Sequence, residues 1–237
     1  MKRIALLNII IVVFIFGCSS NNKKEQVGLL SHFPFTGNAK DVINKNSNVI
    51  IKDAKLTTDR FGNSNSAYSF NGVTSSISVS VKNFPKYQKQ KSISWWYFTE
   101  ELPKYNKKYG AQNMIVLVDT LNGTGIQFGF RAPEYKTLGL DTWIWGGGNV
   151  LDVIPPKAGV WHYCVYTYDR EIHKFYLDGK EVASSKVTLQ DGMPTQLMFG
   201  NYPTGKQYFT GKLDDIRIYN NALDFNSINT LFKEVQN

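Results

Sequence analysis

Two tryptophans that lie two residues apart form the most suggestive chemical pattern in this sequence. From Leu138 to Trp145, aliphatic residues alternate with Gly139, Asp141, Trp143 and Trp145. Side chains of a β-strand alternate between its faces, so if the aliphatic set faces a core, both indoles share the outer surface. Sugar rings stack their apolar C–H faces on indoles, and their hydroxyl groups need fixed polar partners. The pattern predicts a saccharide platform, whereas the inverted register would turn both indoles inward.

A glycine run follows this segment directly. Gly146 to Gly148 precede Asn149, and glycine allows a ligand to approach the backbone closely. We therefore expect Trp143, Trp145, Asp141 and Asn149 to form the ligand-binding set.

Carboxylate pairs with the spacing of a catalytic site are missing from the strand patterns. A retaining glycoside hydrolase needs two carboxylates about 5–5.5 Å apart. Glu100 and Glu101 are adjacent, as are Asp214 and Asp215, so each pair is expected to point to opposite faces of a strand. The 3 histidines lack partners at metalloenzyme spacing. The sequence thus predicts a protein that is not an enzyme, although carboxylates from different strands leave a divergent glycan-active enzyme open.

The elements that would position these residues are strands. Short apolar runs alternate with clusters of Gly, Asn, Asp and Pro, as in β-sandwiches. Residues 161–168 are apolar on both faces, which indicates a central strand and a buried, inert thiol at Cys164. Asp178-Gly179 is the strongest hairpin signal.

One helix is expected, over residues 224–235. Asp224 or Asn226 would be its N-cap. The inward-facing residues would be Ile228, Leu231 and Phe232.

The first residues indicate export. Lys2 and Arg3 precede an apolar run from Ile4 to Phe16, which has the length of a signal peptide. The following Gly17-Cys18 resembles the end of a bacterial lipoprotein box, and that resemblance implies lipidation of Cys18. An ordinary cleaved signal peptide is the alternative. We expect a signal peptide at 1–17, a polar flexible tether at 18–26 and one domain at 27–237.

The charge of the chain narrows the choice of partners. The formal net charge of +8 includes Lys2 and Arg3, so removing the signal peptide leaves 8 − 2 = +6. Nucleic acid is a poor partner for an exported protein, whereas acidic polysaccharides and anionic lipid headgroups are better candidates. The excess is partly concentrated in two stretches, Lys82 to Lys91 and Pro103 to Gly110. The simpler explanation is that these lysine-bearing loops only aid solubility.

Several segments together resemble the laminin G-like branch of the concanavalin A-like superfamily. They are LTTDRFGNSNSAYSFNGVTSSISV from Leu56, GVWHYCVYTYDREIHKFYLDGKEVASS from Gly159 and YFTGKLDDIRIYNNALDFNSINTLF from Tyr208. The resemblance implies an all-β, two-sheet antiparallel jelly-roll sandwich with a short C-terminal helix. It also implies that the first and last strands lie side by side.

The same resemblance suggests a structural calcium site. Asp214 matches the family's usual ligand and Gly72 its carbonyl donor, although Asn71 stands where the family usually has Asp. Ca²⁺ needs six to eight oxygen ligands, so two matched residues are an incomplete set. Beyond possible calcium, no cofactor is expected.

The function expected from these features is non-catalytic binding of a glycan or glycoprotein. The protein would be lipid-anchored in the bacterial cell envelope, at the outer membrane or cell surface. Because the step from fold to function is an analogy, a structural or adhesion module that binds an envelope or host protein remains the alternative.

Overall fold

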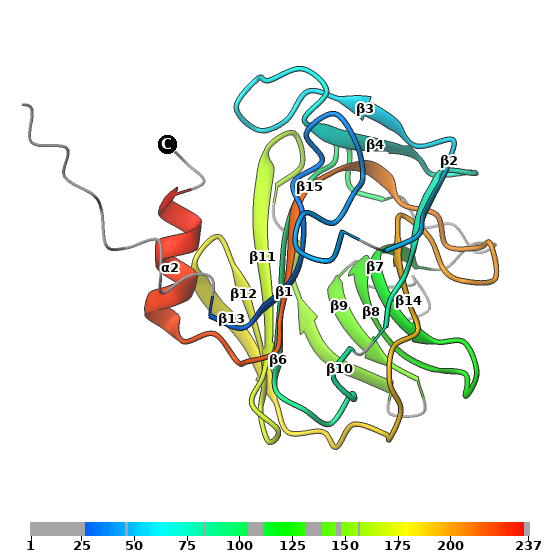
Figure 1. Cartoon of the computed structure of the whole chain (residues 1–237). Helices are drawn as coiled ribbons and strands as arrows, with labels where there is room; N and C mark the ends of the chain where they lie inside the picture. Colours follow the sequence, from blue (N-terminus) through cyan, green and yellow to red (C-terminus); the bar gives the residue numbers. More distant parts are fainter. Residues whose placement is uncertain are drawn as a thin grey trace, which may run out of the picture.

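The computed structural model describes residues 27–234 except 46, 83, 104–110, 131–138, 146–147 and 156, and only the backbone of 148–152. Within this part, two antiparallel sheets face each other as a sandwich (Figure 1). One sheet has eight strands in the order β13-β12-β11-β6-β15-β4-β3, with β1 also paired to β15. The other has seven strands in the order β10-β9-β8-β7-β14-β5-β2. The predicted all-β sandwich is confirmed.

The strands have the following bounds. The eight-stranded sheet contains β1 (Leu29–Phe33), β3 (Lys55–Thr57), β4 (Ala67–Asn71), β6 (Lys91–Phe98), β11 (Trp161–Tyr168), β12 (His173–Leu177), β13 (Lys180–Ser185) and β15 (Thr210–Tyr219). The seven-stranded sheet contains β2 (Val49–Lys52), β5 (Ser76–Ser80), β7 (Gln112–Asp119), β8 (Thr124–Phe130), β9 (Leu140–Ile144), β10 (Gly148–Val153) and β14 (Gln196–Phe199).

The core lies between the sheets and is rich in aromatic rings. Trp95 from one sheet meets Phe128 from the other, with ring centroids 5.4 Å apart. Phe33 and Phe199 join the sheets in the same way, at 5.1 Å and an interplanar angle of 72°. Each such ring removes a large apolar area from water, which makes this layer the main source of stability. Cys164 is fully buried here, as predicted.

The two ends of the domain meet within one sheet. Leu29 pairs with Tyr219 and Phe33 with Ile216, so β1 lies beside β15. Strand β4 flanks the other part of β15, since Tyr68 pairs with Leu213. The prediction that the first and last strands lie side by side is therefore confirmed.

The hairpin predicted at Asp178-Gly179 joins β12 to β13. Both residues have positive φ, 50° and 77°, as a two-residue type I′ turn requires. The central strand predicted at residues 161–168 is β11, which lies between β12 and β6.

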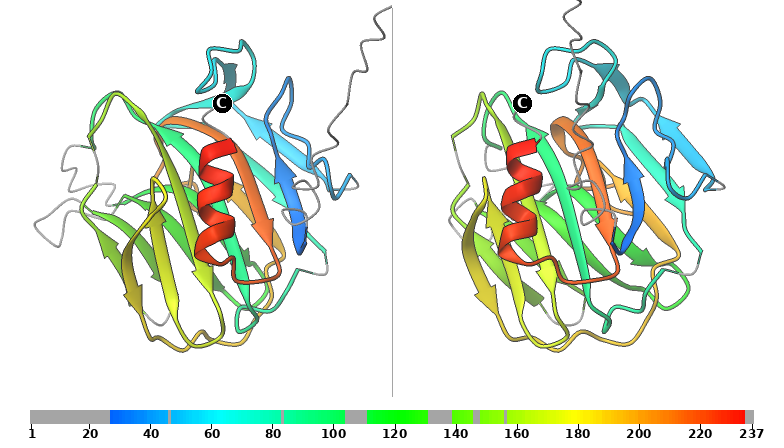
Figure 2. Two further views of the ribbon diagram at one scale, coloured as in Figure 1. Left: turned by 90° about the vertical axis from the view of Figure 1, so that its left-hand side faces the viewer. Right: turned by 60° about the vertical axis from the view of Figure 1, so that its left-hand side comes forward.

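Helix α2 (Phe225–Glu234) covers the outer face of the eight-stranded sheet (Figure 2). Asp224 accepts a hydrogen bond from the Ser227 amide at 2.7 Å, which confirms it as the N-cap. Ile228 and Leu231 are buried against this face, and Phe232 stacks over Trp96 with ring centroids 6.1 Å apart. No helix in the described residues is both long and apolar enough to cross a bilayer.

The three other tryptophans of the sequence differ in their burial. Trp95 and Trp96 are buried, Trp95 between the sheets and Trp96 beneath α2. Trp161 is only partly buried, because it begins β11 on the outer face beside Phe98, at 5.7 Å.

Candidate functional site

The outer face of the seven-stranded sheet carries the predicted tryptophan pair. Leu140 and Ile144 of β9 are buried in the core between the sheets. Because faces alternate along a strand, Asp141 and Trp143 point to the outer face, and Trp145 follows on the same side. The register predicted from the sequence is the observed one. Leu138 lies outside the described residues.

Strand pairing places Trp143 in a row that crosses the sheet. Directly opposed residues of an antiparallel ladder project to the same face. From β10 to β2 the row consists of Asn149, Trp143, Gln127, Val116, Met198, Ser78 and Ile50. We call these residues the Trp143 row.

The two indoles have different surroundings. Trp145 packs against a small outer cluster of Val116, Val118 and Met198, and its ring lies 5.3 Å from that of Tyr202. Its Nε1 is buried without a hydrogen-bond acceptor. Trp143 is partly buried and takes part in no ring contact among the described residues. Trp145 therefore packs against neighbouring side chains of the outer face, while part of the Trp143 side chain is accessible to a ligand.

Gln127, the neighbour of Trp143 in the row, carries an unsatisfied polar atom. The residue is 8% exposed, and its Oε1 is buried without a donor. Leaving a buried acceptor unpaired costs about 1–3 kcal/mol. Because this oxygen is inaccessible to solvent, a ligand could donate a hydrogen bond to it only after the side chain turns toward the surface. The sequence analysis gave Gln127 no role.

The remaining members of the predicted ligand-binding set lie on the same strands. Asp141 is buried, at 7% exposure, and pairs with Gly129 across the ladder. Asn149 pairs with Trp143, which places its backbone beside the indole. The Asn149 side chain lies outside the described part of the structure, as do Gly146 and Gly147.

The structure does not bring the two predicted calcium ligands together. Asn71 pairs with Thr210 and Tyr68 with Leu213, so Gly72 and Asp214 are about five residue steps apart, roughly 16 Å along the ladder. The Asp214 carboxylate is bonded to the Arg60 guanidinium. No group of three or more His, Cys, Asp or Glu residues with metal-site geometry occurs in the described residues. Asp214 and Gly72 therefore do not fit one calcium site, and calcium binding as such stays a prediction.

Asp214 and Asp215 share one partner, contrary to the expectation that adjacent residues point apart. Asp215 has φ of 46° and lies in a β-bulge between the pairs of Asp214 and Arg217 with β6. The bulge turns both carboxylates to Arg60, whose Nη2 lies 3.2 Å from Asp215 Oδ2. His32 Nε2 and Arg217 Nε contact the other oxygen of Asp215 at 2.8 and 2.9 Å.

Burial and charge move the pKa values of the two carboxyls in opposite directions. Desolvation by burial raises the pKa of Asp214 to about 7, although Arg60 opposes the shift. Burial would raise the pKa of Asp215 too, but the hydrogen bond from His32 and the charges of Arg217 and Arg60 hold it well below its ordinary value. These groups are bonded to one another on the sheet, which is the pattern of a structural network.

The other two histidines are also fixed by hydrogen bonds. His162 Nδ1 lies 2.8 Å from Asp178 Oδ2, and its Nε2 lies 2.9 Å from the Lys157 carbonyl oxygen. His173 contacts the Tyr166 hydroxyl and the Val187 carbonyl, both at 2.7 Å. Each histidine thus has structural partners, in agreement with the interpretation from sequence.

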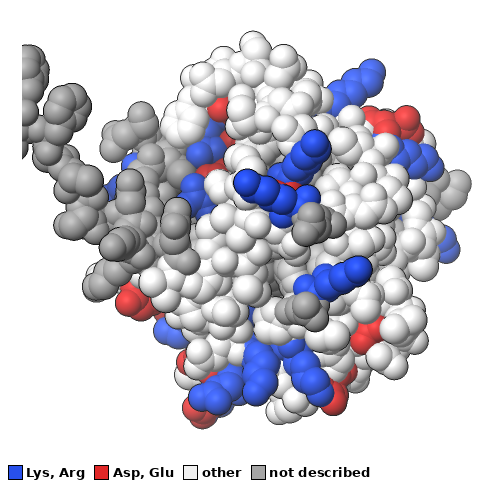
Figure 3. Space-filling model, viewed as in Figure 1, with Lys and Arg blue, Asp and Glu red and all other residues white. Residues whose placement is uncertain are grey.

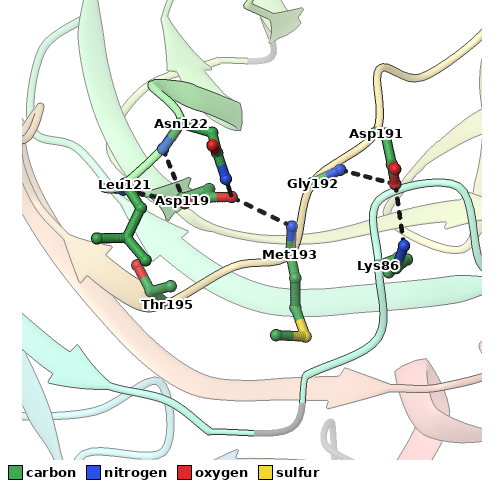
Figure 4. A pocket seen from close by; sticks show the side chains of 8 residues that line it. All are labelled: Lys86, Asp119, Leu121, Asn122, Asp191, Gly192, Met193 and Thr195. Atoms are coloured by element: carbon green, nitrogen blue, oxygen red, sulfur yellow. Dashed lines mark hydrogen bonds and ion pairs between the residues drawn. The ribbon is translucent and has the colours of Figure 1, made fainter.

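A pocket of about 490 Å³ lies at the end of the sandwich near the β7–β8 turn (Figure 4). Asp119 in its wall accepts hydrogen bonds from Leu121, Asn122 and Met193, and these bonds hold the pKa of its carboxyl below the ordinary value. At the rim, Lys86 and Asp191 form an exposed pair at 3.5 Å. Asp119 therefore stabilises the β7–β8 turn through these hydrogen bonds, which indicates a structural role for its carboxylate.

Positive charge does not gather at one place on the face of the molecule that Figure 3 shows. On the face seen in Figure 3, lysine and arginine form separate groups with uncharged surface between them. Cys18, the predicted lipidation site, lies outside the described residues.

Comparison with known proteins supports this fold. The chain resembles the binding domain of Paraclostridial Mosquitocidal Protein 1, with 19% identity, TM-score 0.65 and coverage of 89% of this chain and 53% of that one. Domain 4 of a GH43 extracellular arabinanase from Geobacillus stearothermophilus, in complex with arabinotriose, has 17% identity, TM-score 0.60 and coverage of 86% and 97%. Trypanosoma rangeli sialidase in complex with sialic acid has 15% identity, TM-score 0.66 and coverage of 88% and 33%.

At these identities the structural matches establish the fold alone, and this chain spans about half the length of the toxin binding domain. Both binding domains and enzymes occur among the matches. No curated protein sequence matches the chain. The laminin G-like model described as "Concanavalin A-like lectin/glucanases superfamily" matches residues 70–229, well over half of the sequence. The chain therefore belongs to the laminin G-like branch of the concanavalin A-like lectin/glucanases superfamily.

Proposed function

We propose that this protein binds glycans without catalysis, through the outer face of its seven-stranded sheet. The observation that carries the proposal is the pairing of Trp143 with Gln127. A partly accessible indole lies beside a buried amide oxygen that lacks a donor. An apolar ring face together with an unsatisfied polar atom matches the two chemical sides of a sugar ring.

Each residue of the platform has a distinct role in this proposal. Trp143 stacks on a sugar ring, and the Gln127 side chain turns toward the surface to accept a hydrogen bond from a hydroxyl group. Trp145 and Tyr202, whose rings are 5.3 Å apart, form a fixed aromatic wall beside them. A rigid wall keeps the ordering cost of binding small, because few side chains need to be immobilised.

The solved structures with this fold support a glycan as the ligand by analogy. One was determined with arabinotriose and another with sialic acid. The proposed setting is the bacterial cell envelope, where lipidated Cys18 would hold the domain near a membrane and bring it close to envelope or host glycans and glycoproteins.

The proposal is tested by affinity electrophoresis and calorimetry with a panel of polysaccharides. Trp143→Ala should weaken binding of the retained glycan at least about tenfold, which corresponds to about 1.4 kcal/mol. Phe225→Ala is a matched control, because Phe225 is 55% exposed and begins α2, on the other sheet. Its affinity should equal that of the wild type.

The variants also separate stacking from packing. Trp145→Ala should lower both thermal stability and affinity, because Trp145 packs on the outer cluster. Trp143→Ala should lower affinity while the melting temperature stays within a few degrees. Unchanged retention of a bound glycan by Trp143→Ala would refute this platform.

A protein partner is the second candidate function, and one observation favours it. Ile50 and Ile51 of the edge strand β2 are 59% and 44% exposed. An exposed apolar edge strand can pair with a strand of another chain. Two results together would favour this function. The wild type would bind no glycan of the panel, and the Ile50→Lys variant would no longer bind an envelope protein that the wild type binds.

A further inference from the structure

We infer that this protein carries a second saccharide site, in a pocket on the eight-stranded sheet beside Phe98 and Lys212. The site goes beyond the proposed function, because Trp143 lies on the other sheet and the two sites share no residue. A domain with both sites could hold two glycan chains at once, one on each sheet.

The pocket has a volume of about 370 Å³, which falls in the range of sites for small ligands. Its wall comes from three neighbouring strands and from the segment that follows β6. The wall includes Ser69 of β4, Phe98 of β6, Thr210 and Lys212 of β15, and Glu100 of the segment after β6.

An aromatic pair gives the site its apolar part. Phe98 pairs with Lys212 on one side and with Trp161 on the other, so the three side chains project to the same face of the sheet. The ring centroids of Phe98 and Trp161 are 5.7 Å apart, and both residues are partly exposed. Helix α2 packs on Trp96 and Tyr163, which form the next row, and leaves this pair partly open. The exposed parts of the two rings can contact the C–H face of a sugar.

Three polar groups of the pocket wall form no hydrogen bond or ion pair within the described part of the chain. They are the Glu100 carboxylate, the Lys212 ammonium and the Thr210 hydroxyl. The ammonium lies over the Phe98 ring, 4.9 Å from its centroid, and does not pair with Glu100 although both line the same pocket. The wall therefore offers an acceptor, a donor and a group that is both.

A saccharide can use all of these groups together. A sugar hydroxyl donates to a carboxylate, and another accepts from an ammonium or exchanges a hydrogen bond with a threonine hydroxyl. A zwitterionic peptide could pair with Lys212 and Glu100, but it would leave the Thr210 hydroxyl and the aromatic pair unused. The combination of polar groups and rings thus favours a sugar.

The walls of the pocket are fixed by hydrogen bonds before any ligand arrives. Thr99 Oγ1 donates to the Glu101 carbonyl oxygen at 2.6 Å, which holds the segment that carries Glu100. On the opposite strand, the Thr210 amide donates to Gln112 Oε1 at 3.0 Å. The Glu101 side chain also lines the pocket, but that residue has other interactions and is given no role in binding. Fixed walls keep the ordering cost of binding small.

The experiment is an NMR titration in which single backbone amides report the place of binding. The probes are cellobiose, maltose and lactose, together with glycylglycine as a zwitterion. We expect at least one disaccharide to shift the amide signals of Thr210 and Gly211, which line the pocket. The same shifts should occur in Trp143→Ala, because Trp143 lies on the other sheet.

Two variants test the polar groups. Lys212→Met keeps an apolar stem beside Phe98 and removes the ammonium, so it should weaken disaccharide binding about tenfold, the usual effect of losing a hydrogen bond to a charged group. Glu100→Ala, at an exposed position, should weaken binding by a similar factor without a change in melting temperature. Lys180→Met, at an exposed position of β13 on the same sheet, is the control and should bind like the wild type.

The outcomes separate this inference from the proposed function. Shifts at Thr210 and Gly211 that persist in Trp143→Ala and weaken in Lys212→Met support the second site, whether or not the Trp143 platform binds polysaccharides. Binding that disturbs only amides of β9 and is lost in Trp143→Ala would overturn the second site and leave the proposed function intact. Shifts at the pocket with glycylglycine alone would overturn the assignment to saccharides. Shifts that neither variant weakens, or no shift at these two amides with any probe, would overturn the inference.

Discussion

Arg60 neutralises two buried carboxylates of the eight-stranded sheet, those of Asp214 and Asp215. Its guanidinium contacts both Asp214 and Asp215 and lies over the Trp96 ring, 5.1 Å from the centroid. Both carboxylates are nearly inaccessible, so they have no solvent to replace a lost partner. Arginine suits this position because its planar fork can bond two carboxylates at once.

Arg60→Met should destabilise the protein by about 3–5 kcal/mol, the usual cost of removing one partner of a buried ion pair. The loss should be larger at pH 8 than at pH 5. The pKa of Asp214 is raised to about 7, so as pH rises from the ordinary value through 7 the unfolded chain ionises first and stability falls. Without Arg60 the ionised form is disfavoured further and the pKa of Asp214 rises, so the fall continues to higher pH.

Urea unfolding at the two pH values measures this difference. Lys180→Met, at an exposed position of β13, is the control and should change stability by less than about 0.5 kcal/mol at both. Equal losses for Arg60→Met at pH 5 and pH 8 would show that Asp214 does not titrate against Arg60.

Residue-level prediction from sequence succeeded where a simple period applied. The outward direction of Trp143 follows from the two-residue period, because Leu140 and Ile144 needed burial. The same rule was wrong for Asp214 and Asp215, because a bulge breaks the period at Asp215. Such a bulge has no clear mark in the sequence, so the contact with Arg60, about 150 residues away, was not foreseen.

At the level of elements, helix α2 is attached to the sheet by a few apolar side chains. Ile228 and Leu231 are buried, and Phe232 stacks on Tyr163 with ring centroids 6.0 Å apart. A helix of 10 residues is too short to be stable alone in water, so this contact determines whether it forms.

Leu231→Ala should cost about 2–5 kcal/mol, because it removes buried methyl groups and leaves a cavity between the helix and the sheet. Phe225→Ala, at the exposed start of the helix, should cost less than about 1 kcal/mol. Chemical denaturation followed by tryptophan fluorescence measures both, since Trp96 lies beneath the helix. A Leu231→Ala protein as stable as Phe225→Ala would mean that α2 adds little to the fold.

The elements themselves could be predicted from sequence because their signals are local. Asp224 as N-cap and the period of Ile228 and Leu231 predicted the helix, and Asp178-Gly179 predicted a hairpin. The row that joins Trp143 to Gln127 could not be predicted, because cross-strand register depends on how several strands align.

At the scale of the whole molecule, the described residues form one sandwich whose first and last strands lie in the same sheet. Strand β15 lies between β6 and β4 and also pairs with β1, so residues from both ends of the domain complete one sheet. Helix α2 covers the eight-stranded sheet, whereas the proposed glycan-binding face is on the seven-stranded sheet (Figures 1 and 2). A ligand on the seven-stranded sheet therefore meets no competition from α2.

The attachment of this sandwich to a membrane is the prediction at the scale of the whole protein. Val27, the first described residue, is 65% exposed and lies nine residues after Cys18. A chain of that length reaches at most about 30 Å, so a lipid on Cys18 would keep the domain close to the bilayer. Cys18→Ser should release the protein into the soluble fraction, because the proposed lipid attachment site is lost.

Cys164→Ala is the matched control for this experiment. Cys164 is fully buried, and burial raises the pKa of its thiol, so it is an unreactive residue that no acyl group reaches. This variant should stay with the membrane fraction, and metabolic labelling with a fatty acid should mark it but not Cys18→Ser. If Cys18→Ser stays membrane-bound after a high-salt wash, the lipid anchor is refuted, since salt removes attachment by the lysine-bearing loops.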